Sequence, residues 1–390
     1  MARRKEKVCL CISIPIICII IIIIICATHF NEECADGLYK NAAVAADSET
    51  CSKIGRDILQ LGGSAVDGAI ATLLCTSIIN PQSMGIGGGS IFTIREQSGK
   101  VRVINARETV PKAFKTDLLA MCPTTTQPME GAHWIGVPGD IRGYERAHKL
   151  YGRLPWASLF EPTIKMAREG VPVPYEAVEI IQKHFADKVR AKISPDRTYD
   201  ASYYNITPYL DSHGTTHVSV LAEDGMAVSV TSTINHIFGS RIFSPKTGIL
   251  LNNELADFCG KTDQIHAGEQ PPSSMSPVIL YSPSQKHIVV IGASGGSMIT
   301  TGVALTLMNF LWFGKTLQDS ISAPVVFVDS KNILNFEPLF DKIVLESLYK
   351  IGHKVKVPQM FYNVVNAVSK ENNCIVAVSD SRKNGKAAGY

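Results

Sequence analysis

The feature that most restricts how this chain can fold is an uncharged run of 20 residues, Val8 to Ala27, with seven consecutive isoleucines. A membrane-spanning helix needs about 20 consecutive apolar residues. Four of the seven residues before the run are Arg or Lys, and such an excess keeps the flanking segment in the cytoplasm. We therefore expect a cytoplasmic tail at 1–7, a transmembrane signal anchor at 8–27 and the remainder outside. The alternative is a cleaved signal peptide.

The formal charge of the chain comes from the same N-terminal segment. The whole chain carries +3, and its first seven residues contribute four positive charges and one negative charge, which is also +3. The remainder is formally neutral and has no basic stripe for nucleic acid. With 390 residues, of which 45% are hydrophobic and 19% charged, the chain is typical of one large globular domain or two ordinary ones.

Six of the ten cysteines lie beyond the apolar run. They form no CxxC pair and have no metal-ligand spacing, and an outside location permits disulfides. They are Cys34, Cys51, Cys75, Cys122, Cys259 and Cys374. Asn205-Ile206-Thr207 is a glycosylation sequon, so we expect a glycan at Asn205.

Local patterns predict secondary structure in the first half of the chain. Ser64, followed by Asp67, is typical of a capping box that begins a helix over Ala65–Ile79. The glycine-rich stretch Met84–Gly89 could in principle hold a phosphate. It follows a helix and precedes a predicted strand over Ser90–Arg95, whereas a dinucleotide fingerprint needs strand, loop, then helix. A tight turn is therefore the favoured interpretation.

Other segments extend this pattern of helices and strands. Asp224-Gly225 separates two alternating runs and predicts a hairpin. The remaining expected elements are strands at Ala42–Ala46 and His287–Ile291, helices at Cys51–Leu61, Tyr175–Ile193 and Ser297–Phe313, helical segments within 140–170, and a glycine turn over Gly292–Gly296. This order favours a layered α+β fold.

Gly214, Thr215 and Thr216 open the first strand of that hairpin. An N-terminal threonine can attack through its hydroxyl while its own α-amine acts as base. An internal threonine gains that amine only if the chain is first cut before it, and glycine tolerates the required geometry. The alternative is an ordinary β-branched strand surface. Thr216 follows in the strand and should point to the opposite face, so its replacement is expected to leave cleavage and turnover largely unaffected.

A resemblance favours the catalytic interpretation. Over nearly all of the region beyond the apolar run, the chain resembles γ-glutamyl transpeptidases, most closely the leukotriene-type branch called glutathione hydrolase 5. The matching stretches are Ala43–Asp47, Gln82–Gly89, Asn105–Glu108, Gly136–Gly139, Gly152–Trp156, Thr231–Asn235, Gly248–Glu254, Ser273–Met275 and Ser379–Arg382.

The resemblance implies a four-layer αββα N-terminal nucleophile hydrolase fold that is anchored in the plasma membrane as a type II protein. Residues 28–214 would form a large-subunit-like region and 215–390 a small-subunit-like catalytic region. The implied reaction cleaves the γ-glutamyl amide of glutathione, its conjugates and leukotriene C4. Acceptor amino acids or dipeptides, or water, then release the glutamyl group. No metal or organic cofactor is implied.

The resemblance also implies roles for individual residues. Thr215 would be the nucleophile, freed by self-cleavage after Gly214, and Thr233 would support it. Cys51 and Cys75 would form a disulfide. The substrate α-carboxylate would be held by Arg107, Ser273 and Ser274, its α-amine by Asn235, Glu254 and Asp257, and the oxyanion by Gly295 and Gly296.

One departure from the family is large. Members carry roughly 150–200 more residues, comparable to a small domain, at a point that falls here near residues 180–184. All the implied site residues survive, but part of the large-subunit scaffold is missing. Two readings follow: an active surface hydrolase and transferase, or an inactive, unprocessed membrane-anchored splice form or degenerate copy.

Overall fold

The computed structural model describes residues 34–35, 37–114, 117–123, 129–171, 191, 213–284, 286–329, 331–358, 363–371 and 373–390. The predicted anchor at 8–27, the sequon at Asn205, the junction at 180–184 and, apart from residue 191, the predicted helix over Tyr175–Ile193 lie outside these residues. Within the described ranges, no helix is long and apolar enough to cross a membrane.

A six-stranded sheet in the order β15-β1-β4-β5-β2-β3 forms the centre of the molecule. Its central hairpin was predicted from Asp224-Gly225, and here β4 and β5 pair antiparallel. The strands are β1 (Ala43–Ala45), β2 (Gly89–Arg95), β3 (Val101–Ala106), β4 (His213–Leu221), β5 (Ala227–His236) and β15 (Ala388–Gly389). Segments on both sides of Gly214 therefore contribute to one sheet.

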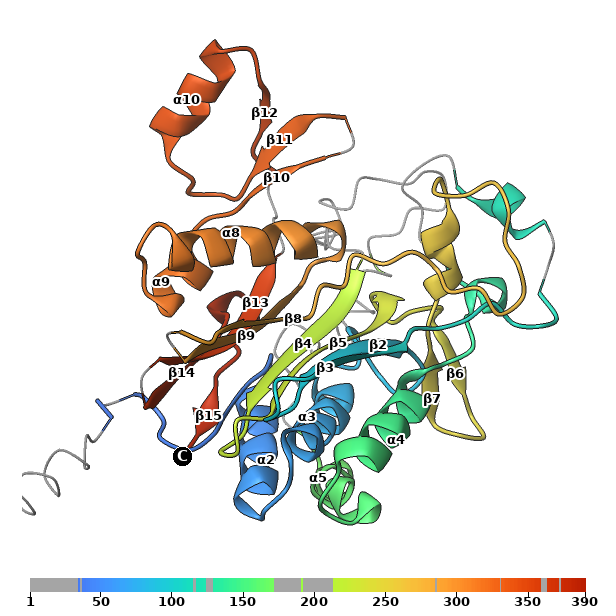
Figure 1. Ribbon diagram of the computed structural model, residues 1–390. Helices are drawn as coiled ribbons and strands as arrows, with labels where there is room; N and C mark the ends of the chain where they lie inside the picture. Colours follow the sequence, from blue (N-terminus) through green and yellow to red (C-terminus); the bar gives the residue numbers. More distant parts are fainter. Residues whose placement is uncertain are drawn as a thin grey trace, which may run out of the picture.

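A second sheet, in the order β14-β13-β9-β8, packs against the first (Figure 1). Its strands are β8 (Val278–Ser282), β9 (His287–Ser294), β13 (Val364–Glu371) and β14 (Cys374–Ser379). Buried apolar residues of both sheets form one cluster between them. Hydroxyl groups also cross this interface, because Ser219 Oγ donates to Asn366 O and Ser229 Oγ donates to Ile291 O.

Helices cover the outer face of each sheet (Figure 1). The first group packs on the six-stranded sheet through the largest apolar cluster, and the second packs on the four-stranded sheet. The first group comprises α2 (Glu49–Gln60), α3 (Ala65–Ile79) and α4 (Asp140–Tyr151), and the second comprises α8 (Ile299–Leu311) and α9 (Leu317–Ser322). Helix α5 (Glu161–Glu169) packs against α3. The layers therefore run helix, sheet, sheet, helix, as an α+β fold.

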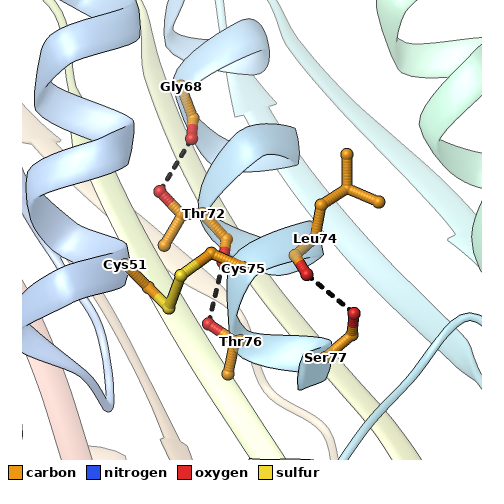
Figure 2. Close-up of a disulfide and its surroundings, with 7 residues drawn as sticks. All are labelled: Cys51, Gly68, Thr72, Leu74, Cys75, Thr76 and Ser77. Carbon is orange, nitrogen blue, oxygen red and sulfur yellow. Dashed lines mark hydrogen bonds between the residues drawn. A yellow bond between two sulfur atoms is a disulfide. The ribbon is translucent and has the colours of Figure 1, made fainter. Parts of the chain in front are cut away.

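The predicted capping box of α3 is confirmed. Ser64 Oγ accepts the Asp67 N–H, and Asp67 Oδ2 accepts the Ser64 N–H. A disulfide between Cys51 of α2 and Cys75 of α3 joins the two helices, as Figure 2 shows. This bond lies in the buried layer beneath the six-stranded sheet, where both cysteines are fully buried.

The predicted glycine turn over Gly292–Gly296 is wrong in its first half. Strand β9 continues to Ser294, because Gly292, Ala293 and Ser294 pair with β13. Gly292 is required there by a close approach, since a Cβ atom would lie 2.2 Å from the His217 ring. The turn begins only at Gly295.

A small module stands apart from the four layers at the top of Figure 1. It consists of β10 (Val326–Val328), β11 (Ile333–Phe336), α10 (Lys342–Lys350) and β12 (Lys354–Lys356). Helix α10 contains no buried side chain. The remaining elements are β6 (Ile242–Ser244), β7 (Ile249–Leu251) and the short 3-10 turns η1 (Leu118–Met121), η2 (Ala132–Trp134), η3 (Trp156–Leu159), η5 (Glu254–Phe258), η6 (Gly296–Met298) and η7 (Ser381–Lys383).

Candidate functional site

The Gly214–Thr215 peptide lies near the start of β4, where the pairing with β5 shifts register. Gly214 is not needed for a left-handed backbone, because it is not among the residues with positive φ. Its reason is steric: a Cβ atom would lie 2.5 Å from the carbonyl oxygen of Gln82 and 2.8 Å from Cα of Ser83. The sequence predicted a glycine for conformational freedom, whereas the structure requires one for close backbone packing.

The Thr233 hydroxyl connects the two residues of this peptide. Thr215 Oγ1 donates to Thr233 Oγ1 at 3.3 Å, and Thr233 Oγ1 donates to the Gly214 carbonyl oxygen at 2.5 Å. The Asn235 N–H also donates to Thr233 Oγ1 at 2.8 Å. Thr215 and Thr233 are both buried, so one hydroxyl orients the side chain of Thr215 and polarises the carbonyl before it.

A buried ion pair holds the backbone on the other side of Thr215. Lys383 Nζ donates to the Thr215 carbonyl oxygen and to Asp47 Oδ2, each at 2.7 Å. Asp47 also accepts from Thr216 Oγ1 at 2.5 Å and, through its other oxygen, from Asn366 Nδ2 at 2.7 Å. Thr216 is fully buried within this network, so its replacement should cost some stability. That the replacement leaves cleavage and turnover largely unaffected stays a prediction.

The predicted carboxylate-binding and amine-binding residues meet around the guanidinium of Arg107. Arg107 Nη1 lies 2.5 Å from Glu254 Oε1, and Nη2 lies 2.7 Å from Asp257 Oδ2. Asn235 Nδ2 donates to Asp257 Oδ1 at 3.3 Å. Because Asn235 also contacts Thr233, hydrogen bonds run without a break from Thr215 to Arg107.

Backbone carbonyl groups bring the two predicted serines next to Arg107. Arg107 donates from Nε to Pro271 O and from Nη2 to Pro272 O, and the serines follow directly in the chain. Ser273 Oγ accepts the N–H of Met275. The carbonyl oxygen of Ser274 accepts from the hydroxyls of Ser276 and Thr300. The two serines are therefore near the guanidinium without bonding to it.

Gly295 and Gly296 lie between β9 and α8, and the turn η6 that they begin contacts β4. Their φ angles are 129° and 55°, a region that residues with a side chain rarely adopt. The backbone N–H groups at the start of η6 and α8 carry partial positive charge. This geometry can stabilise a developing oxyanion near β4.

Three carboxyl groups surround the one guanidinium. Glu108 Oε2 lies 4.0 Å from Arg107 Nη1, in addition to the contacts from Glu254 and Asp257. Burial raises the pKa of Glu254 to about 7, although Arg107 opposes that rise. Burial, reinforced by Glu254, raises the pKa of Glu108 well above its usual range. One positive charge does not compensate three negative charges, so we infer that this group retains a proton near neutral pH.

Sequence reasoning missed Asp47, Lys383 and Glu108 as parts of the site. The signal that could have found them was their position, because Asp47 and Glu108 end two of the matching stretches and Lys383 follows a third. Their function depends on contacts across the fold, which a single stretch does not reveal.

The fold has a counterpart among solved structures. It is similar to a cephalosporin acylase from Bacillus halodurans, with a TM-score of 0.75 over 92% of this chain and 98% of that one. At 18% sequence identity this similarity concerns the fold alone. The four-layer α+β architecture is therefore one that this chain shares with that acylase.

Sequence comparison identifies the family of this chain. The family model described as Gamma-glutamyltranspeptidase matches residues 51–182 and 173–390. The chain is 33% identical to "Glutathione hydrolase 5 proenzyme" of Rattus norvegicus over 93% of this chain and 95% of that protein. It is 32% identical to the protein of the same name in Homo sapiens, over 92% and 94%. The chain belongs to the γ-glutamyltranspeptidase family, a family of glutathione hydrolases and γ-glutamyltransferases.

The matches also locate the missing segment. The alignment with the rat protein runs over 542 positions, whereas 93% of this 390-residue chain is about 363 residues, so about 180 aligned positions have no residue here. The family model matches in two pieces that overlap over residues 173–182. The internal deletion expected near residues 180–184 is confirmed.

Proposed function

We propose that this chain is a γ-glutamyl hydrolase and transferase whose nucleophile is Thr215, released by cleavage of its own Gly214–Thr215 bond. The observation that carries the proposal is the Thr233 hydroxyl, which bonds both the Thr215 hydroxyl and the Gly214 carbonyl oxygen. The hydroxyl that must attack and the carbonyl that must be attacked are thus adjacent and share a partner.

In the first reaction, Thr215 Oγ1 attacks the carbonyl carbon of Gly214. The C–N bond breaks, an ester forms between Gly214 and the threonine oxygen, and the hydroxyl proton passes to the departing nitrogen. Water then hydrolyses the ester. The products are the Gly214 carboxylate and a Thr215 residue with a free hydroxyl and a free α-amine, which serves as the base in later turnovers.

In the second reaction, the freed hydroxyl attacks the γ-glutamyl amide of the substrate. The N–H groups at Gly295 and Gly296 are suited to stabilise the oxyanion that forms. The amide C–N bond breaks, the leaving amine takes a proton from the Thr215 ammonium, and a glutamyl ester remains. Water or an acceptor amino acid or dipeptide releases the glutamyl group and regenerates the hydroxyl.

Recognition of the glutamyl head is proposed as an exchange of ion pairs. The substrate α-carboxylate accepts hydrogen bonds from the Arg107 guanidinium and lies beside Ser273 and Ser274. The substrate α-ammonium donates hydrogen bonds to the carboxylates of Glu254 and Asp257, with the Asn235 amide beside them. This exchange is supported by the direct contacts of Arg107 with both carboxylates, because a zwitterion supplies one replacement charge for each partner.

We propose glutathione, its conjugates and leukotriene C4 as substrates, at the outer face of the plasma membrane. The substrate range rests on the similarity to the glutathione hydrolase 5 proteins. The location rests on the charged head and the apolar run Val8–Ala27. Protease added to intact cells should remove the bulk of the chain, and full protection of residues 28–390 would contradict the location.

The second candidate is an inactive, uncut, membrane-anchored form. One observation favours it: about 180 positions of the alignment with the rat protein have no residue in this 390-residue chain. Packed helices missing from the large-subunit-like region would leave apolar faces exposed, and native stability is only about 5–15 kcal/mol.

One experiment separates the two candidates. The protein is expressed through the secretory pathway and run on a reducing gel beside the Thr215→Ala and Thr215→Ser variants, and each is assayed for glutathione hydrolysis. Two fragments, 1–214 and 215–390, with activity that disappears in Thr215→Ala and partly survives in Thr215→Ser support the enzyme. A single inactive chain supports the second candidate. Cleavage or activity that persists in Thr215→Ala would falsify the assignment of the nucleophile.

A further inference from the structure

Two disulfides join parts of the chain on opposite sides of Gly214–Thr215. Cys34 is bonded to Cys374 and Cys122 to Cys259, with Cα–Cα distances of 5.7 and 5.6 Å. Both partners of the third disulfide, Cys51–Cys75, precede the cleavage point. Cutting the Gly214–Thr215 bond therefore leaves two covalent links between the fragments.

The link at Cys259 is adjacent to the site. Cys259 directly follows the turn η5, whose residues Glu254 and Asp257 contact Arg107. The other side chains of the turn, Leu255, Ala256 and Phe258, are buried in an apolar cluster against which Cys122 and Cys259 pack. The turn thus presents its acidic side to Arg107 and its apolar side to the segment that carries Cys122.

The two ends of η5 are held differently. Before the turn, Asn252 donates to the carbonyl oxygens of Gly87 and Gly136, and Asn253 donates to that of Met129. After the turn, the chain enters residues 260–270, which are mostly exposed. The Cys122–Cys259 bond is therefore the covalent restraint at the end of the turn that leads into this exposed stretch.

We propose that Cys122–Cys259 is a positioning disulfide, which joins the two fragments and fixes Glu254 and Asp257 against Arg107. The roles of these three residues in holding the substrate rest on the function proposed above. The disulfide touches neither substrate nor reacting atoms. It acts by restricting the movement of a short turn whose two carboxylates must both face one guanidinium. Cys34–Cys374 lies at β14 and supplies the second link.

The first test determines covalent connectivity. The secreted full-length protein is alkylated to block free thiols and run on gels without and with reductant, and its digest is searched by mass spectrometry for linked peptides. The proposal expects one band without reductant, two bands with reductant, and a linked peptide pair for Cys122 and Cys259. Two bands without reductant, or alkylated Cys122 or Cys259, would overturn it.

The same test separates this proposal from the proposed cleavage. A single band in both lanes means that the Gly214–Thr215 bond is not cut. The linked peptides still decide the disulfide, because they form whether or not that bond is intact. Failure of cleavage and failure of the link are therefore different results.

The second test is kinetic and uses a matched control. The pair Cys122→Ser and Cys259→Ser should raise the KM for a γ-glutamyl substrate about tenfold and change kcat by less than about twofold. The pair Cys34→Ser and Cys374→Ser removes the other link, away from η5, and should leave KM unchanged. Equal KM values in the two variants would overturn the positioning role.

A further variant distinguishes positioning from general loosening. In an Asp257→Asn background, loss of Cys122–Cys259 should raise KM by less than about twofold, because one of its two targets is already disabled. A full tenfold further increase would contradict the proposal. If the Cys122→Ser, Cys259→Ser variant does not fold, the Cys122–Cys259 bond is instead reduced and alkylated in the folded Cys34→Ser, Cys374→Ser protein. Cys122 and Cys259 are partly exposed, whereas Cys51 and Cys75 are fully buried, so KM is then read with Cys51–Cys75 intact.

Discussion

The two ends of the site differ in how completely their polar groups are paired. At the Thr215 end, both oxygens of Asp47 and the hydroxyls of Thr215 and Thr233 are hydrogen-bonded. At the Arg107 end, both carboxyl oxygens of Glu108 and one of Glu254 are buried without a hydrogen-bond partner among the described residues. The named polar groups of the Thr215 end are all hydrogen-bonded, whereas the Arg107 end has more carboxyl groups than its one guanidinium can pair.

This difference suggests separate tasks for the two ends. A hydrogen-bond network in which every group is paired holds its side chains in one geometry. At the Arg107 end, a zwitterionic head group can replace existing ion pairs: its carboxylate pairs with the guanidinium and its ammonium pairs with the acids. The local net charge stays the same, because the head group carries one charge of each sign. Under the function proposed above, the Thr215 end would carry the chemistry and the Arg107 end would exchange partners with the substrate. The predictions below address each end in turn.

The largest effect is expected at the satisfied end. Lys383→Met removes the cation from a carboxylate, Asp47, whose side chain is fully buried. Breaking a buried pair by removing one partner costs about 3–5 kcal/mol, and the Thr215 carbonyl loses a donor as well. Urea denaturation should show this loss of stability at neutral pH, and the rate of cleavage before Thr215 should fall with it.

The matched control is Lys386→Met, three residues further along the chain. Lys386 is 69% exposed and pairs with the exposed Glu49, so its removal should change stability little. Adding Asp47→Asn to Lys383→Met should recover part of the lost stability, because no unpaired charge then remains. Equal effects of the two lysine substitutions would contradict the buried role of Lys383.

The second prediction concerns the acid that adjoins the Arg107 end. Burial raises the pKa of Asp140 to about 7, although the hydroxyls of Ser90, Ser232 and Tyr144 oppose the rise. The unfolded chain releases this proton near pH 4 and the folded chain near pH 7. The contribution of Asp140 to stability is therefore complete below about pH 4 and is lost as the pH rises through about 7.

The measurement is the free energy of unfolding at pH 5, 6 and 7 for the parent and Asp140→Asn. The parent should lose about 2 kcal/mol more than the variant between pH 5 and pH 7, because the amide does not ionise. His217, whose pKa burial lowers to about 3, changes stability in the opposite direction below pH 6.5. It is present in both proteins and cancels in the difference. Parallel profiles would show that Asp140 is ionised when folded.

The local parts of this fold could be predicted from sequence and the long-range parts could not. The capping box of α3 and the β4–β5 hairpin depend on residues a few positions apart. The Cys34–Cys374 bond joins residues 340 positions apart, and Lys383 donates to the carbonyl oxygen of Thr215, 168 positions away. The identity of the site residues came from resemblance, since an isolated Thr-Thr-His pattern is ordinary strand chemistry.

A third, smaller effect is expected at the exchanging end. Arg107→Lys keeps the charge but loses the planar fork that spans Glu254 and Asp257. The KM for a γ-glutamyl substrate should rise about tenfold, or about 1.4 kcal/mol, and cleavage before Thr215 should continue. Arg102→Lys is the control, because the Arg102 side chain on β3 donates instead to the hydroxyl of Tyr151. Unchanged KM in Arg107→Lys would remove Arg107 from substrate binding.

The smallest predicted effect returns to the satisfied end and concerns Thr216. Thr216→Val keeps the shape of the side chain but removes the hydroxyl that donates to Asp47. Since Lys383 and Asn366 still bond that carboxylate, stability should fall by only about 1 kcal/mol. A double-mutant cycle with Asp47→Asn should give a coupling energy of about 1 kcal/mol. The control cycle uses Ser98→Ala, an exposed residue in the turn between β2 and β3, and should give none. Equal coupling energies in the two cycles would mean that Thr216 contributes to stability only by packing in the strand. The hydrogen bond from Thr216 to Asp47 would then add nothing to the network that Lys383 and Asn366 form with Asp47.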